Sequence, residues 1–482
     1  MSITFPGLYV QEIPGQTHAI GSASTSLTAF IGRASMGPVA TPVPCNSLAD
    51  VHRLFGPDWT DLPMGQSLSD FFTNGGVLAL IVRLTANGAA PAGLQLDGLP
   101  LVAADPGAWG NALTATVTAV AADGTFTLEA RLVLGGQTLT ETWTGLSVDA
   151  DGGATRIDRV LESSQVLRVA LNARGQPALP AAPPSQGASA TGAGGEDSPP
   201  LSDQTLIDGL SALDLADNFN LLVIPPDQLG QDIPAAVWQS AAACCQQHRA
   251  FLLVDPPSAW TSAQTAAQQQ TTTPLMSPGL GRNAAVYFPN LLHDTPFPPS
   301  GAVAGIYAAT DQSRGVWKAP AGLAASLNGI AGLALALTDA DSGLINPVGI
   351  NALRSFPVYG PVVWGARTLA GADAVADDYK YVPVRRLALY IEDSIYTGCQ
   401  WTAFEPNSPA LWSALRLQIS TFLQGLEAQG AVFGYQITCD ASTTTQADID
   451  AGIVNVLVAI APVKPAEFLI LRIQLTTAST PA

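Results

Sequence analysis

Short apolar runs alternate with helix-like segments between residues 201 and 343, and this alternation limits what the chain can fold into more than any other feature. The runs "FNLLVIPP" (219–226), "AFLLVDPP" (250–257) and "AAVYFP" (284–289) are almost wholly apolar, which is typical of strands buried on both faces. A segment with the composition of a helix, "AAVWQSAAACCQQHR" (235–249), lies between the first two. Strands that alternate with helices predict a largely parallel sheet covered on both sides.

Two more core strands are expected nearer the start of the chain. "STSLTAFIGRA" (24–34) predicts a first core strand, and the continuous apolar run "GVLALIVRL" (76–84) predicts another that is buried on both faces. Between them, "SLADVHRLFG" (47–56) predicts a short helix, with Ser47 as its N-cap and Gly56 as its stop.

The composition changes after this first core segment. From residue 113 to about 170, alternating Thr, Val and Leu with Gly turns, as in "TFTLEARLVL" and "QTLTETW", predict the antiparallel strands of a small β module. Residues 172–200 are rich in Ala, Pro, Gly and Ser and hold little apolar material to bury. We expect this tract to be a mobile surface loop.

One well-marked helix is predicted in the last third of the chain, over residues 409–429. Ser408 is its expected N-cap, Pro409 occupies the first position and Gly430 is its stop. Its expected apolar face consists of Leu411, Leu415, Ile419, Phe422, Leu423 and Leu426.

Three strand candidates follow that helix: "AVFGYQITCD" (431–440), "IVNVLVAIAPV" (453–463) and "EFLILRIQLTT" (467–477). The last of these alternates apolar side chains and is followed by only a handful of residues. A strand of this kind presents unpaired backbone groups to which another chain can add. A second extended segment, "FPGLYVQEIPG" (5–15), is bounded by prolines near the other end of the chain.

Charge and composition exclude several classes of partner. The net charge is −18, and only three of the 20 basic residues are lysines. A nucleic-acid-binding protein needs clustered Lys and Arg, which this chain lacks, so we expect no nucleic acid partner. The longest apolar windows are too short to span a bilayer, and the opening "MSITFPGLYV" lacks the pattern of a secretory signal, so membrane insertion is not expected.

No residue set carries the pattern of a catalytic or metal site. The chain shows no GxSxG elbow, Walker loop or GxGxxG after a strand, and its histidines lie far apart at positions 18, 52, 248 and 293. The acidic pairs Glu392–Asp393 and Asp377–Asp378 could be read as a dyad, but adjacent carboxylates usually cap loops or face solvent. We therefore expect no enzyme, no cofactor and no bound metal. The five cysteines show no paired spacing, and we expect reduced, buried thiols.

A large folded body without a catalytic constellation, with strand-like segments at both ends, indicates an assembly subunit. The physical mode would be β-augmentation, in which a segment leaves its own body and completes a sheet in a neighbouring copy. Each backbone hydrogen bond contributes roughly 1 kcal/mol, so one exchanged strand supplies a few kcal/mol besides the burial of its side chains.

The chain closely resembles the contractile-tail sheath proteins of phages, tailocins and phage-tail-like extracellular contractile injection systems. Motifs that occur in the order of that family cover nearly the whole chain and are specific when taken together. They are "FPGLYVQEIP" (5–14), "STSLTAFIGRASMGP" (24–38), "DPGAWGN" (105–111), "AFLLVDPP" (250–257), "PPSGAVAGIYAATDQSRGVWKAPAG" (298–322), "LINPVGINALRSFP" (344–357), "VVWGARTLAG" (362–371), "YVPVRRLALYIEDSI" (381–395), "WTAFEPN" (401–407) and "PVKPAEFLILRI" (462–473).

This resemblance implies a structural subunit that assembles in the bacterial cytoplasm. Copies would stack as hexameric rings around an inner tube, between a baseplate and a terminal cap, and contraction would drive the tube through a target envelope. Two other readings stay open: an α/β hydrolase-like enzyme, which would need a clustered nucleophile and base, and a passive tube or capsid protein, which is usually much shorter.

The resemblance also implies a multidomain α/β and α+β fold. It combines a discontinuous inner α+β domain with exchanged terminal strands, an α/β middle domain of subtilisin-like topology and an inserted antiparallel β module. The expected divisions are an N-terminal arm (1–20), a first core segment (21–88), an outer β module (90–171), a flexible loop (172–200), the middle domain (201–343), the inner domain (344–465) and a C-terminal arm (466–482).

Individual residues acquire expected roles from the same resemblance. The N-terminal arm would contact a neighbouring subunit through Leu8, Tyr9, Val10, Gln11 and Ile13. The C-terminal arm would do so through Phe468, Leu469, Ile470, Leu471, Ile473 and Leu475. On the helix at 409–429, the polar residues expected to face the tube are Arg416, Gln424 and Glu427.

Overall fold

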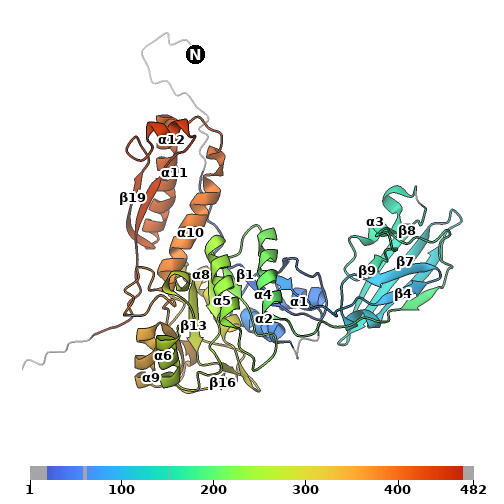
Figure 1. The fold of residues 1–482 in the computed structure, drawn as a ribbon, viewed down its shortest axis with the longest axis horizontal. Helices are drawn as coiled ribbons and strands as arrows, with labels where there is room; N and C mark the ends of the chain where they lie inside the picture. Colours follow the sequence, from blue (N-terminus) through green and yellow to red (C-terminus); the bar gives the residue numbers. More distant parts are fainter. Residues whose placement is uncertain (1–18, 58–61, 150, 471–482) are drawn as a thin grey trace, which may run out of the picture. The chain divides into compact units, whose positions relative to one another are not determined.

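The computed structural model of the chain describes residues 19–57, 62–149 and 151–470. These residues form two compact units, both drawn in Figure 1. The hairpin unit comprises Leu387–Val463 and the described residues up to Ala23, and the sheet unit comprises Ser24–Arg386 and the residues from Lys464 onward. The expected mixed α/β multidomain organisation is therefore confirmed at this level.

The sheet unit holds most of the secondary structure. Its helices are α1 (Leu48–Phe55), α2 (Pro63–Thr73), α3 (Ile157–Leu161), α4 (Asp203–Gly209), α5 (Ala235–Gln247), α6 (Ala263–Thr272), α7 (Pro278–Gly281), α8 (Ser300–Arg314) and α9 (Asp339–Ile345). Its strands are β1 (Thr28–Gly32), β2 (Val43–Cys45), β3 (Ala79–Arg83), β4 (Gly93–Leu96), β5 (Leu99–Ala103), β6 (Leu113–Val120), β7 (Phe126–Leu134), β8 (Gln137–Leu146), β9 (Leu167–Val169), β10 (Ser189–Thr191), β11 (Leu221–Val223), β12 (Phe251–Val254), β13 (Ala284–Phe288), β14 (Leu291–Leu292), β15 (Pro296–Phe297), β16 (Gly332–Leu333), β17 (Ile350–Phe356) and β18 (Gly360–Val363).

An eight-stranded sheet, in the order β18-β17-β13-β12-β11-β1-β3-β2, forms the centre of the sheet unit. The six inner strands run parallel, with Ala29 of β1 opposite Leu222 of β11 and Leu80 of β3, and the two edge strands β2 and β18 are antiparallel. The predicted parallel sheet is confirmed, and it is wider than the 201–343 segment. It also takes in β17 and β18, which lie beyond the expected boundary at residue 343, because β17 pairs with β13.

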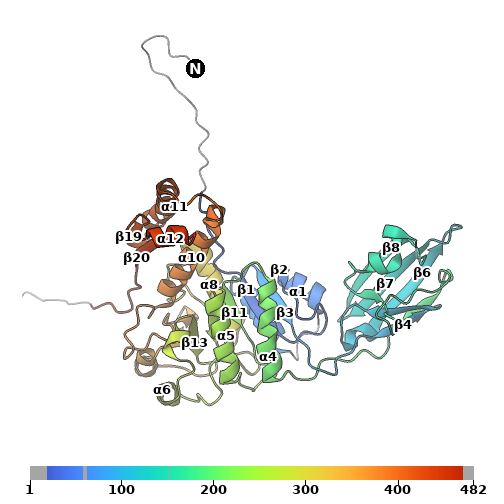
Figure 2. The ribbon, with the colours of Figure 1, turned by 45° about the horizontal axis from the view of Figure 1, so that its top comes forward.

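Helices cover both faces of this sheet because alternate side chains of each strand point in opposite directions. Ala29 and Ile31 of β1 belong to a core with Val237 of α5. Phe30 points to the other face, where its ring centroid lies 5.3 Å from that of Phe71 in α2. Figure 2 shows α4 and α5 side by side over the sheet.

Small residues let α2 and α8 pack closely. A Cβ atom on Gly305 of α8 would lie 2.4 Å from the carbonyl oxygen of Phe71 in α2, and one on Gly301 would lie 2.4 Å from that of Ser67. Real Cβ atoms do not approach other atoms this closely. The two glycines, four residues apart on one helix face, are therefore required by the separation of the helices.

The β module forms two sheets, β10-β6-β7-β8 and β4-β5-β9, around a separate apolar core. The antiparallel strands predicted for residues 113–170 are confirmed. The mobile loop expected at 172–200 is wrong for the end of that tract, because β10 pairs with β6 and the bridges Ala90–Glu196 and Gly93–Ala193 continue the pairing. Backbone hydrogen bonds order a tract whose side chains supply little apolar surface.

A buried arginine links the β module to the central sheet. The guanidinium of Arg83, at the end of β3, donates to the backbone oxygens of Ala34 (2.9 Å), Gly37 (2.7 Å) and Pro106 (2.7 Å). The last of these lies in the "DPGAWGN" stretch of the module. Burial lowers the pKa of Arg83 to about 10, which leaves the side chain charged at neutral pH.

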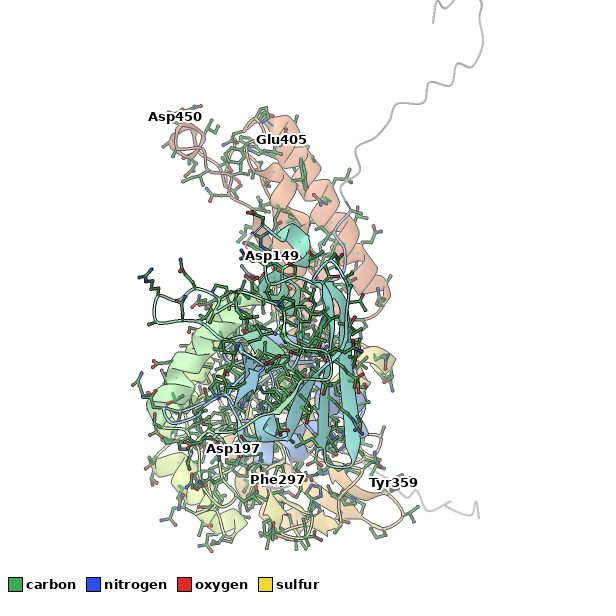
Figure 3. All side chains as sticks on the ribbon, turned by 90° about the vertical axis from the view of Figure 1, so that its right-hand side faces the viewer. Asp149, Asp197, Phe297, Tyr359, Glu405 and Asp450 are labelled. Atoms are coloured by element: carbon green, nitrogen blue, oxygen red, sulfur yellow. The ribbon has the colours of Figure 1, made fainter. Side chains whose placement is uncertain are left out.

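The hairpin unit consists of the greater part of α10 (Val382–Gly398), with α11 (Pro409–Ala428), β19 (Val432–Thr438), α12 (Gln446–Asp450) and β20 (Leu457–Pro462). The predicted cap is confirmed, since the Ser408 side chain accepts from the backbone N–H of Leu411. The predicted apolar face of α11 is buried except for Phe422, which is half-buried with its ring centroid 6.0 Å from that of Tyr390. Glu405 and Asp450, labelled in Figure 3, are exposed.

A buried carboxylate holds the start of α8. Asp255 follows β12 and accepts hydrogen bonds from the backbone N–H and the hydroxyl of Ser300, both at 3.0 Å. Burial raises the pKa of Asp255 to about 7, although both hydrogen bonds from Ser300 oppose that rise. The group therefore changes its charge close to neutral pH.

The close packing of α2 and α8 predicts opposite effects for two glycine-to-alanine changes. Gly305→Ala should lower the free energy of unfolding by about 1–3 kcal/mol, because its Cβ overlaps the Phe71 carbonyl. In the control Gly343→Ala in α9, the added Cβ has no other atom within 4 Å, so this change should raise the free energy of unfolding by about 0.5–1 kcal/mol. Urea unfolding followed by circular dichroism checks both, and a neutral Gly305→Ala would contradict the packing.

The raised pKa of Asp255 predicts a pH-dependent difference between wild type and Asp255→Asn. The folded pKa of about 7 exceeds the unfolded value of 3.8, so this group's contribution to stability is present below pH 4 and is lost as the pH rises through 7. Between pH 5 and pH 8, wild type should lose roughly 3 kcal/mol relative to the variant. Parallel unfolding curves at both pH values check this, and a constant difference would contradict it.

Candidate functional site

Two almost fully buried arginines lie close to each other in sequence, just before and just inside the start of α10. Arg367 precedes the helix and Arg386 lies in its second turn. Charged residues make up only 12% of the chain, so a buried charge is a rare feature here. A buried guanidinium is tolerated only where acceptors surround it. The partners of these two arginines come from segments far away in the sequence.

Arg386 forms a buried ion pair with Asp311 of α8. The two guanidinium nitrogens of Arg386 lie 2.9 and 2.6 Å from the two carboxylate oxygens of Asp311, and the side chains are 3% and 2% exposed. Arg386 also donates to the backbone oxygen of Thr25 at 2.8 Å, and its guanidinium lies 4.8 Å from the ring centre of Tyr307. The pair thus joins α8, the start of α10 and the chain just before β1.

The burial of this pair makes each partner depend on the other. Desolvation raises the pKa of Asp311, and the charge and hydrogen bonds of Arg386 oppose that rise. Removing either partner would leave an uncompensated buried charge. In other proteins such a change lowers the free energy of unfolding by about 3–5 kcal/mol.

Arg367 forms a second cluster with Glu467, the first residue of the strand-like segment at the C-terminal end. The Nε and Nη2 atoms of Arg367 lie 2.7 and 2.8 Å from the two carboxylate oxygens of Glu467. The same carboxylate accepts from the side-chain amide of Asn346 at 2.7 Å and from the hydroxyl of Tyr381 at 3.0 Å. We call this arrangement of Arg367, Asn346, Tyr381 and Glu467 the clasp.

The clasp is fixed to the central sheet. The remaining guanidinium nitrogen of Arg367 donates to the backbone oxygen of Asn346 and to Asp373, both at 2.9 Å. The backbone of Arg367 exchanges hydrogen bonds of 2.6 and 2.7 Å with the side chain of Asn351, a fully buried residue of β17. Arg367 therefore connects Glu467 with β17 of the central sheet.

Protonation state also favours a closed clasp. Burial alone would raise the pKa of Glu467, but the hydrogen bonds from Arg367 and Asn346 outweigh it and leave the pKa below its ordinary value. A lowered carboxylate pKa means that the clasp contributes stability above the unfolded value of 4.5 and loses it as the pH falls through the folded value. The clasp is charged and intact at neutral pH.

Three consecutive apolar side chains follow the clasp and face solvent. Phe468, Leu469 and Ile470 are 72%, 85% and 76% exposed, and no described residue from 464 to 470 belongs to a strand. The other expected C-terminal contact residues, Leu471, Ile473 and Leu475, lie outside the described residues. So do the five expected N-terminal ones, Leu8, Tyr9, Val10, Gln11 and Ile13.

The hairpin unit offers a sheet of only two strands. Among the described residues, β19 pairs with β20 alone, in antiparallel register from Val432–Pro462 to Thr438–Leu457. Phe433 and Leu457 are exposed on it, while the hydroxyl of Tyr435 contacts Ser420 of α11. A two-stranded sheet has two open edges, and it is marginally stable unless further strands or a helix support it.

The polar residues expected to face a tube differ in their surroundings. Gln424 and Glu427 are exposed on α11. Arg416 is half-buried and donates to the backbone oxygen of Cys439 and, at 3.0 Å, to the hydroxyl of Ser413, so its guanidinium is occupied within the unit.

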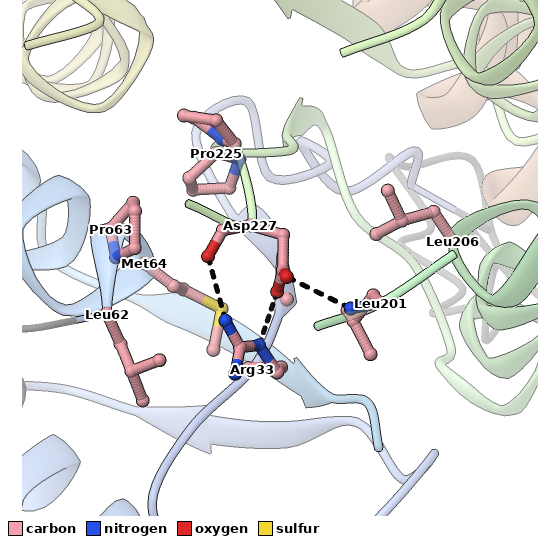
Figure 4. A pocket seen from close by; sticks show the side chains of 10 residues that line it. Arg33, Leu62, Pro63, Met64, Leu201, Leu206, Pro225 and Asp227 are labelled. Carbon is pink, nitrogen blue, oxygen red and sulfur yellow. Dashed lines mark hydrogen bonds and ion pairs between the residues drawn. The ribbon is translucent and has the colours of Figure 1, made fainter. Parts of the chain in front are cut away.

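A crevice at the carboxyl ends of β1 and β11 lies where a doubly wound sheet usually binds a ligand. Figure 4 shows the side chains that line it, with Arg33 and Asp227 pointing toward each other. Arg33 reaches across to Asp227, with Nε and Oδ1 2.5 Å apart, and the other Asp227 oxygen accepts from the backbone N–H of Leu201 at 2.9 Å. The ion pair joins two loops at this edge of the sheet.

The other chemistry-bearing residues serve local structure. His293 bonds to Asp70 at 3.0 Å and His248 to Asp214 at 2.9 Å, and Asp377 pairs with Arg282. The cysteines are free thiols; three are buried and two are half-buried. Within the described ranges no cluster of His, Cys, Asp or Glu has metal-binding geometry, and none of the helices there is long and apolar enough to cross a bilayer.

The sequence interpretation missed the residues of both clusters, although they lie within the quoted motifs. Asp311, Arg367 and Glu467 are isolated charges in largely apolar stretches, such as "GIYAATD" for Asp311 and "AEFLIL" for Glu467, and Arg386 follows directly after Arg385. A lone charge inside an apolar pattern is the signal that could have singled out the first three, since such a charge must find a partner. Nothing in one sequence says which partner it finds.

Two family models match this chain. The phage tail sheath protein central domain matches residues 201–369, and the phage tail sheath C-terminal domain matches residues 374–476. Together they cover more than half of the chain, including both arginines and Glu467.

Curated relatives and solved structures agree with these models. The tail sheath protein of Vibrio phage KVP40 is 30% identical over 171 residues, which is 35% of this chain and 25% of that protein. The tail sheath protein of Enterobacteria phage T4 is 27% identical over 154 residues, 32% of this chain and 23% of that protein. The matched part of the chain thus spans about a quarter of the length of these relatives.

Structures of similar fold cover more than nine tenths of the chain. The contracted helical sheath of the anti-feeding prophage shares a TM-score of 0.60 at 24% identity and covers 98% of this chain and 99% of its own. A sheath tail protein from Listeria innocua shares a TM-score of 0.63 at 14% identity and covers 92% and 97%. The chain belongs to the phage tail sheath family.

Proposed function

We propose that this chain is the repeating subunit of a contractile sheath. Copies stack as hexameric rings around an inner tube, joined to a baseplate and a terminal cap, and contraction drives the tube through a target envelope. Family membership supports this role, and the similar folds include the baseplate and contracted helical sheath of the anti-feeding prophage and the contracted sheath of an extracellular contractile injection system. Assembly takes place in the bacterial cytoplasm, and the subunit acts as a structural protein.

One observation carries the proposal for how copies hold together: an incomplete sheet and an exposed apolar segment occur in the same chain. No other described strand pairs with the β19–β20 sheet, and Phe468, Leu469 and Ile470 expose apolar surface beyond the clasp. Both are unfavourable in an isolated molecule and both are relieved when a segment of one copy pairs with the hairpin of another.

The same reasoning extends to the remaining expected roles. The N-terminal segment from Leu8 to Ile13 and the C-terminal residues from Phe468 to Leu475 are the exchanged strands, which complete a discontinuous inner domain. Gln424 and Glu427, exposed on α11, face the tube, whereas Arg416 serves its own unit. The parallel sheet with helices on both faces supports a subtilisin-like topology for the middle domain, and the β module projects from it as an insertion.

Truncation after Glu467 tests the role of the C-terminal segment. This design keeps the clasp, so the fold should keep its thermal stability while the protein fails to form striated cylinders when co-expressed with its tube partner. Electron microscopy of truncated and full-length proteins checks the result. Cylinders of normal length and number from the truncated chain would refute the exchanged-strand proposal.

A single charge in the same segment should weaken assembly without weakening the subunit. Phe468→Asp removes an apolar contact of about 1.5–3 kcal/mol, which raises the protein concentration needed for assembly by roughly 10- to 100-fold. The matched control is Leu215→Asp, because Leu215 and Phe468 are each 72% exposed. Sedimentation of both variants across a concentration series checks this. Equal effects of the two changes would count against a specific contact at Phe468.

A further inference from the structure

We infer that the clasp decides which sheet the C-terminal segment can join. It keeps the segment away from the edge of its own β20 and leaves that edge open for a strand of another copy. The inference rests on the proposed function, because it explains why the segment pairs with another copy and not with its own chain.

The sequence by itself favours pairing within one chain. β20 ends at Pro462 and the strand-like alternation begins at Glu467, so four residues connect two segments of strand character. Loops of four residues are common in β-hairpins, and strands that follow each other along a chain usually pair. Without another constraint, the segment from Phe468 onward would become the third strand of a β19-β20 meander.

The structure shows a different arrangement at the root of the segment. β20 pairs with β19 and with no other described strand, and residues 464–470 form no strand. Glu467 is instead held in the sheet unit by four hydrogen bonds, two from Arg367, one from Asn346 and one from Tyr381. These bonds use both carboxylate oxygens.

Opening the clasp is energetically unfavourable, because it would leave buried hydrogen-bond donors of Arg367 without an acceptor. The Arg367 side chain is 2% exposed, and its Nε and Nη2 donors have Glu467 as their partner. If Glu467 moved to extend the β19–β20 sheet, these donors would stay buried without an acceptor. Phe468, Leu469 and Ile470, which follow directly, are exposed, so among the described residues of this segment the firm attachment ends at Glu467.

Hydrogen exchange on the unassembled full-length protein tests the inference directly. The variant is Glu467→Ala, and the control is Lys464→Gln, which changes one exposed charge three residues away. In wild type and in the control, amides on the outer edge of β20 should exchange quickly. In Glu467→Ala, we expect at least tenfold slower exchange of those amides, because the released segment pairs with β20 of its own chain.

Two further variants make the outcome decisive. Truncation after residue 467 in the Glu467→Ala background should restore fast exchange, which identifies the segment as the protecting strand. If Glu467→Ala lowers the melting temperature of the sheet unit too far for measurement, Glu467→Gln, which keeps an amide oxygen for Arg367, is compared in the same way. Equal exchange of the β20 edge in the variant and in wild type, or a protected edge in wild-type monomers, would overturn the inference.

The test separates this inference from the proposed function. Exchange is measured on single copies, so its result stands even if the wild-type protein forms no cylinders with a tube partner, an outcome that would defeat the proposed function alone. Conversely, wild type could form normal cylinders while hydrogen exchange in Glu467→Ala stays unchanged. That result would support the sheath role and show that the clasp does not control strand exchange.

Discussion

A guanidinium can be buried only when its N–H groups donate hydrogen bonds. Three buried arginines of this chain donate to acceptors in segments that lie far apart in the sequence, and so hold these segments together. Arg83 connects β3 with the base of the β module, Arg386 connects α8 with the chain before β1, and Arg367 connects the central sheet with Glu467. Hydrophobic burial stabilises each part but is not directional. The planar guanidinium of an arginine donates hydrogen bonds in fixed directions, and these bonds determine how the segments are oriented.

Arg386, and Glu467 as the partner of Arg367, lie near the points where the chain passes between the two units. The chain passes between the sheet unit and the hairpin unit after residues 23, 386 and 463. Arg386 bonds to Thr25 near the first passage and lies at the second, and Glu467 follows the third. Each passage is therefore fixed on the side of the sheet unit.

Much of this fold could be predicted because local patterns control it. Apolar runs such as "AFLLVDPP" are buried strands of a parallel sheet, Ser408 caps α11 as its side-chain chemistry requires, and the Thr-rich segments form the β module. The mobile loop expected near residue 190 was wrong because composition describes side chains, whereas β10 is held by backbone pairing with β6. Composition cannot reveal a strand that is ordered in this way.

The clasp could not be predicted for a different reason. Arg367 and Glu467 stand 100 positions apart, and each is unremarkable within its own segment. Electrostatic partners separated by this distance are brought together by the sheet, so they become visible only after the strands have been arranged in space. The role of Glu467 as the end of an anchored stretch, with exposed apolar residues directly after it, depends on that arrangement as well.

The geometry of the clasp also bears on how such proteins diverge. Lysine at position 367 could not offer two parallel N–H groups to one carboxylate, and aspartate at position 467 would be one methylene too short to reach the same donors. A change at either position alone should therefore break the clasp. Among diverged relatives, the two sites should be retained together or replaced together.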